Sequence, residues 1–141
     1  MKFIATLSFG ILIFLLTCTE NVHELVFYQQ LHFQFNPHPD FNPFLNFTGY
    51  PFGSPTYFTQ KIGHGMCFFL FSLLLSRVAN KILIVIPISI GYALITEIAQ
   101  VYFSRTGCLL DVFYDSVGIF SYFALRVLLS QKKYYPIEPN G

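Results

Sequence analysis

The sequence has few charged residues for its length. Of its 141 residues, 11% are Asp, Glu, Lys or Arg, whereas 54% are hydrophobic and 19% are aromatic. A soluble domain carries about 25% charged residues, so this chain lacks the polar groups that cover a water-facing surface. The net charge is only +1, and no basic field points to nucleic acid as a partner. The lipid bilayer is therefore the expected surrounding.

Cysteine is also scarce. Cys18, Cys67 and Cys108 are odd in number and widely separated, which argues against a disulfide framework and against a structural zinc site. We expect at least two of them to be small apolar packing residues. The sequence predicts no cofactor and assigns no metal site.

Four apolar segments follow one another, over residues 3–17, 59–78, 82–103 and 109–129. The second helix could start at Thr59 or already at Ser54-Pro55, because Ser and Thr cap helices and Pro suits the first turn. A helix needs about 20 apolar residues to span the hydrocarbon core. The first segment is short and is also compatible with a cleaved signal peptide, but we expect it to be a retained membrane anchor over residues 1–18. Short loops join the other three, which predicts an antiparallel core over residues 59–130. The expected fold is an all-α, polytopic membrane bundle of about four transmembrane helices.

Most Lys and Arg residues lie at one set of helix ends. The connection over residues 19–58 is rich in Phe, Pro and Asn and contains no Lys or Arg. The positive-inside rule predicts a multi-pass protein of the cell (cytoplasmic) membrane with both termini in the cytoplasm, including a tail over residues 131–141. The connection is then extracytoplasmic. The residues on the expected cytoplasmic side are Lys2, Arg77, Lys81, Arg126, Lys132 and Lys133.

Ionisable residues inside the apolar segments lie at similar depths. Glu97 is about six residues, roughly 9 Å, from the outer end of its helix, Asp115 is about as deep, and His64 is slightly shallower. Because such groups are costly in a membrane, we predict one outward-facing pocket near the extracytoplasmic end. Its lining would be His64, Glu97, Gln100, Asp111 and Asp115, with Lys61 and Arg105 at the rim.

A purely structural interpretation of the same residues also remains open. His64 would then hydrogen-bond Glu97 across two helices, and Arg105 would pair with Asp111 to close the last hairpin.

The order and spacing of these residues resemble the VanZ-like membrane proteins. That family carries Asp-Lys-x-x-His at the head of one helix, Glu-x-x-Gln near the end of the next, a loop Arg, and Asp-x-x-x-Asn-x-x-Gly in the last helix. Here Gln60 replaces the first Asp and Asp115 replaces the Asn. The corresponding positions, across about two-fifths of the chain, are Lys61-Ile62-Gly63-His64, Glu97-Ile98-Ala99-Gln100, Arg105, Asp111, the substituted Asp115 and Gly118.

The resemblance implies a membrane fold, and Gly118 is expected to serve helix packing. It carries no established reaction, although the founding member of the family is associated with low-level resistance to the glycopeptide teicoplanin. The favoured function is a role at the bacterial cell envelope, in which Lys61 and Arg105 engage a phosphate, a lipid-linked precursor or a glycopeptide head group.

Two alternatives stay open. One is a membrane enzyme in which a His beside Glu and Asp performs acid–base work or binds a divalent metal. The other is a scaffold or a proton-linked transporter, the latter needing more than one copy. No catalytic residue is assigned, and the oligomeric state is not predicted.

Overall fold

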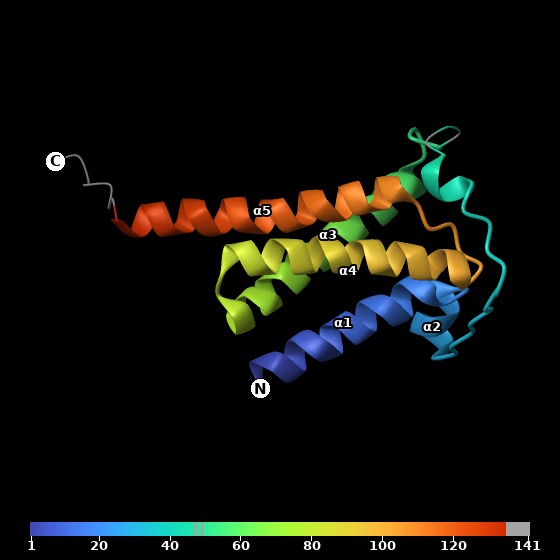
Figure 1. The fold of residues 1–141 in the computed structure, drawn as a ribbon, viewed down its shortest axis with the longest axis horizontal. Helices are drawn as coiled ribbons and strands as arrows, with labels where there is room; N and C mark the ends of the chain where they lie inside the picture. The colour runs from blue at the N-terminus through green and yellow to red at the C-terminus, as the bar shows by residue number, and fades with distance from the viewer. Residues whose placement is uncertain (47, 49, 135–141) are drawn as a thin grey trace.

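The computed structural model describes residues 1–46, 48 and 50–134. Within these residues every regular element is helical (Figure 1), which confirms the predicted all-α class. The long helices α3, α4 and α5 are apolar enough to cross a membrane. The shorter α1 has 17 residues and is about 26 Å long. The elements are α1 (Lys2–Cys18), α2 (Val22–Tyr28), η1 (Pro43–Leu45), α3 (Pro55–Ala79), α4 (Ile82–Tyr102) and α5 (Leu109–Tyr134).

Two helices are longer than the apolar runs that predicted them. Helix α3 begins at Pro55, where proline suits the first turn because its missing N–H has no partner there. Helix α5 continues to Tyr134, five residues past the predicted end, since Gln and Lys favour helix as much as apolar residues do. Most of the predicted tail, residues 135–141, lies outside the described residues.

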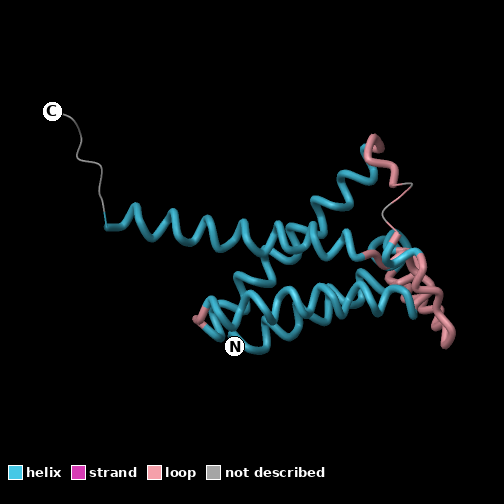
Figure 2. Tube along the Cα trace, turned by 45° about the horizontal axis from the view of Figure 1, so that its top comes forward, coloured by secondary structure: helices cyan, strands magenta, loops and turns pink. Residues whose placement is uncertain are grey.

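The helices form an up-and-down bundle. Helices α3, α4 and α5 alternate in direction, and α1 runs parallel to α4 (Figure 1). Helix α3 packs against both α4 and α5, and α1 lies against α3 and α4. The turned view shows α3 crossing α5 at an angle (Figure 2). The N-terminus and the α3–α4 turn therefore lie at one end, and the residue 19–54 connection and the α4–α5 loop lie at the other (Figure 1).

The centre of the bundle is apolar, and hydrogen bonds join some of its helices. Phe68, Val85 and Ile119 are almost completely buried. The Tyr92 ring of α4 stacks on Phe71 at 4.9 Å. The Tyr92 hydroxyl donates to the Gly10 carbonyl at 2.6 Å, which ties α1 to the bundle.

Helices α3 and α5 approach most tightly at two glycines. A Cβ on Gly118 of α5 would overlap the backbone carbonyl of Gly65 in α3. Only residues without a side chain allow two helix backbones to come this close. The expected packing role of Gly118 agrees with this placement.

The connection from α1 to α3 folds back over the end of α4. The Asn36 amide donates to the Tyr102 carbonyl at 2.7 Å. Phe33 and Phe35 pack against the Phe103 ring, with centroids 5.5 and 5.8 Å apart. Aromatic side chains of the connection thus cover the end of the bundle where the polar residues gather.

Candidate functional site

Lys61 of α3 and Asp111 of α5 form an ion pair across the two helices. Lys61 Nζ lies 2.6 Å from Asp111 Oδ1, and the two side chains are 12% and 6% exposed. Lys61 is therefore not a freely exposed rim residue, as its position near the helix end suggested. A buried pair of this kind is costly to break, because either charge left alone is uncompensated.

His64 points between two buried carboxylates. Its Nδ1 atom lies 3.5 Å from Asp115 Oδ1 on α5 and 3.9 Å from Glu97 Oε1 on α4. Both acids are completely buried, whereas the His64 side chain is 26% exposed. The three helices thus bring together the three groups whose similar depth the sequence indicated.

Glu97 is held in place by donors on both of its oxygens. Gln100, one turn later in α4, donates its amide to Glu97 Oε1 at 2.7 Å. The backbone N–H of Cys108 donates to Glu97 Oε2 at 2.9 Å. Cys108 lies just before the first residue of α5, where N–H groups have no partner within the helix. The carboxylate therefore serves as a cap for α5 supplied by another helix.

Gly107 makes this capping contact possible. A Cβ at this position would overlap the Glu97 carbonyl oxygen and press on Val101. The α4–α5 loop consequently lies directly on the end of α4. Neither Gly107 nor Cys108 was a predicted site residue, although a glycine just before an acidic first turn was an available signal.

Arg105 and Asp111 do not form the hairpin ion pair that the structural interpretation proposed. Arg105 Nη1 donates to the Glu20 carbonyl at 2.6 Å, while Asp111 pairs with Lys61. The guanidinium thus anchors the start of the connection. It carries five N–H donors in total, so this bond leaves others for a ligand.

A cavity of about 320 Å³ opens beside the cluster. Five of the seven predicted site residues line it: Lys61, His64, Gln100, Arg105 and Asp111. Glu97 and Asp115 lie behind this lining, since neither side chain is exposed. The remaining wall is largely apolar and includes Ile13, Leu16 and Phe68. The predicted pocket is therefore shallower than the full cluster, and His64 is the link between the cavity and the buried acids.

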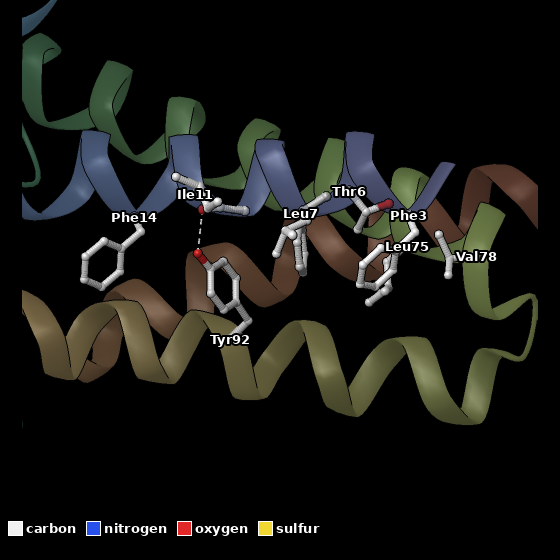
Figure 3. A pocket seen from close by; sticks show the side chains of 10 residues that line it. Phe3, Thr6, Leu7, Ile11, Phe14, Leu75, Val78 and Tyr92 are labelled. Atoms are coloured by element: carbon white, nitrogen blue, oxygen red, sulfur yellow. Dashed lines mark hydrogen bonds between the residues drawn. The ribbon is translucent and has the colours of Figure 1, made fainter. Parts of the chain in front are cut away.

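Another cavity, of about 440 Å³, lies between α1, α3 and α4 (Figure 3). Its lining is almost entirely apolar, and the Tyr92 hydroxyl, which belongs to this lining, is bonded to the Gly10 carbonyl of α1. None of the predicted site residues belongs to it. At this depth an apolar hollow is suited to lipid chains and offers no group for chemistry.

Tyr50, which lies outside the membrane-spanning helices, contacts the α4–α5 loop. Its hydroxyl donates to Cys108 Sγ at 2.7 Å. Burial, followed by this hydrogen bond, raises the pKa of Tyr50 above its ordinary value. The phenol therefore keeps its proton and remains a donor to the loop that caps α5.

A known protein is similar to this chain over most of its length. The chain is 39% identical over 121 residues to the uncharacterized membrane protein YwnJ of Bacillus subtilis (strain 168), and the match covers 86% of each chain. No family model matches the sequence, and no solved structure matches it. The resemblance to VanZ-like proteins accordingly stays a prediction.

Proposed function

Because the chain belongs to the same family as the membrane protein YwnJ of Bacillus subtilis, we propose that it acts at the bacterial cell envelope as a VanZ-like protein. Its cavity would hold the anionic head group of a lipid-linked envelope precursor. The observation that supports this most is a cavity whose lining combines two cations, Lys61 and Arg105, with apolar side chains.

The charges on the wall favour an anion. Lys61 and Arg105 face the cavity with Asp111 as the only carboxylate among its lining residues. Asp111 is already paired with Lys61. Arg105 donates one hydrogen bond to the uncharged Glu20 carbonyl. Charge-assisted bonds from such donors to a phosphate are about twice as strong as neutral ones.

The apolar part of the wall suits a ligand that is itself part lipid. Ile13 and Leu16 of α1 and Phe68 of α3 contribute this surface. A head group with a hydrocarbon tail would place its charge on Arg105 and Lys61 and its first carbons on these side chains. This arrangement needs no extraction of the ligand from the bilayer.

The proposed orientation places this cavity at the outer leaflet. Six of the eight Lys and Arg residues lie toward the opposite end of the bundle. There Arg126 of α5 donates to Asn80 in the α3–α4 turn at 3.0 Å. By the positive-inside rule that end faces the cytoplasm, and Met1 and the end of α5 lie with it.

Binding of a short-chain polyprenyl phosphate to the purified protein in lipid nanodiscs tests the proposal. We expect the phosphate to bind and the matching alcohol to bind at least about tenfold more weakly, a difference of about 1.4 kcal/mol. Inorganic phosphate at the same concentration separates recognition of the free anion from recognition of the lipid. Equal binding of alcohol and phosphate would contradict the proposal.

The variant Arg105→Gln gives the sharper comparison. It removes the cation while Lys61 and Asp111 keep their pairing, and we expect about a tenfold loss of phosphate affinity. Arg77→Gln, at an exposed arginine of the opposite end, is the matched control and should bind as the unaltered protein does.

The envelope role has a cellular test. A Bacillus subtilis strain lacking YwnJ and expressing this chain should differ in teicoplanin sensitivity from the same strain expressing Arg105→Gln at equal protein level. Identical sensitivity in the two strains would count against a glycopeptide-related role, while leaving the lipid-binding measurement to decide the head-group proposal.

A further inference from the structure

We propose that His64, Glu97 and Asp115 bind a divalent transition-metal ion, with zinc as the representative case. His64 Nδ1, a Glu97 oxygen and an Asp115 oxygen lie within 4.8 Å of one another. A tetrahedral ion with ligands at about 2.0–2.2 Å holds those ligands about 3.3–3.6 Å apart. The His64–Asp115 separation of 3.5 Å already has this value. The His64–Glu97 separation is 3.9 Å and needs an inward shift of about 0.3–0.6 Å. The Glu97–Asp115 separation is at most 4.8 Å and needs a shift of at most about 1.5 Å.

The carboxylate of Asp115 supplies an independent observation in favour of a ligand site. Its side chain is completely buried, yet neither carboxylate oxygen has a hydrogen-bond partner among the described residues. A buried carboxylate normally accepts several hydrogen bonds or binds a metal, because its desolvation is otherwise uncompensated. The His64 imidazole is its near neighbour, but at 3.5 Å it satisfies at most one oxygen.

The surroundings of Glu97 resemble those of a metal ligand held by its neighbours. Gln100 and the Cys108 N–H fix the orientation of the carboxylate, as outer partners fix ligands in metal sites. Oε1 retains a lone pair for an ion, since an ionised carboxylate oxygen accepts more than one contact. Oε1 and Asp115 Oδ1 both lie within 4 Å of His64 Nδ1, and the ion would lie between these three atoms.

Charge and ligand type favour a transition metal over calcium or magnesium. Two buried carboxylates this close repel each other unless a proton or a cation lies between them, and a dication offsets both charges. The imidazole favours ions such as Zn²⁺ or Fe²⁺ over Ca²⁺ and Mg²⁺, which prefer oxygen ligands.

Three protein ligands leave one coordination position free, as in catalytic rather than structural zinc sites. His64 lines the cavity and the two acids lie behind it, so the cavity provides the path by which an ion enters. This proposal does not depend on head-group binding, since its ligands include only one residue of the cavity wall.

The test is metal binding by the full-length protein in detergent, after chelation and dialysis. Titration with Zn²⁺ should reach one ion per chain, and Co²⁺ should give the visible absorption of a four-coordinate site. Asp115→Asn removes a charged ligand while keeping its shape, and we expect zinc affinity to fall by more than the roughly tenfold to hundredfold that loss of an outer partner causes. Glu97→Gln, which keeps an acceptor for Cys108, should behave in the same way.

An exposed pair on the connection is the matched control. His32 and Glu24 lie 3.9 Å apart and are both largely exposed, so Glu24→Gln should leave the zinc stoichiometry and affinity unchanged. Folded protein that takes up no zinc at micromolar concentration would overturn the proposal. So would an unchanged affinity in both Asp115→Asn and Glu97→Gln. Polyprenyl phosphate binding measured with a chelator present shows separately whether the head-group proposal holds.

Discussion

At the residue scale, Gly118 is a position where a single added methyl group should disturb the packing of two helices. Its Cβ would overlap the Gly65 carbonyl, so Gly118→Ala forces α3 and α5 apart. We expect a loss of about 1–3 kcal/mol in the free energy of unfolding, the usual cost of overpacking. Unfolding by SDS titration of the detergent-solubilised protein, followed by circular dichroism, measures it.

Gly91 provides the control for that substitution. It lies within α4, and a Cβ added there would meet no atom within 4 Å. Alanine is also a better helix former than glycine by about 1 kcal/mol. Gly91→Ala should therefore be neutral or slightly stabilising. Equal destabilisation by both alanines would mean that glycine conformation, and not the Gly65 contact, sets the effect.

Glu97 should tolerate an isosteric amide better than an apolar side chain. Glu97→Leu leaves the Gln100 amide and the Cys108 N–H without their acceptor, and each unpaired buried donor costs about 1–3 kcal/mol. Glu97→Gln keeps an oxygen for Cys108 and should lose less. The same unfolding titration compares the two, and a leucine variant as stable as the glutamine variant would contradict the capping role.

The sequence predicted which polar residues lie at a similar depth in the bundle. It did not predict which of them form ion pairs and hydrogen bonds with one another. The similar depth of His64, Glu97 and Asp115 followed from counting residues along three helices. The choice of Asp111 as the partner of Lys61 depends on the rotation of α5, which the spacing alone leaves open. The Glu97–Cys108 bond involves a backbone N–H, and a backbone donor leaves no side-chain signal in the sequence.

At the element scale, Tyr92 is the polar tie between α1 and the bundle. Tyr92→Phe removes the hydrogen bond to the Gly10 carbonyl and keeps the ring that stacks on Phe71. We expect a loss of about 0.5–1.5 kcal/mol and faster hydrogen exchange confined to α1. Faster exchange throughout α4 as well would mean that the hydroxyl supports α4 itself.

The helices themselves were largely predictable because apolar runs mark them. The predicted third segment, residues 82–103, differs from α4 by one residue at its end. The prediction ended the last helix too early, because α5 continues into polar sequence. Helix α3 begins at Pro55, one of the two starts that the sequence offered. The course of the connection was not predictable, since contacts such as Asn36 to Tyr102 join segments that share no periodicity.

At the scale of the whole molecule, the orientation in the membrane can be measured directly. In protein whose native cysteines are replaced, Thr106→Cys in the α4–α5 loop should react with an impermeant thiol reagent in whole cells. Asn80→Cys in the α3–α4 turn should not, and both positions are exposed. Labelling of Asn80→Cys with Thr106→Cys silent would show that the orientation is reversed.

The bond from the Cys108 amide to Glu97 also makes the protein its own reporter. An amide proton held by a carboxylate resonates far downfield, and its chemical shift follows the charge on that carboxylate. A single ¹⁵N-labelled cysteine amide would therefore register any change of state at Glu97 without a probe being added. The rate of deuterium exchange at the same amide would report how often the α4–α5 loop opens. One amide group would therefore report both the charge of the buried cluster and the opening of the loop that covers it.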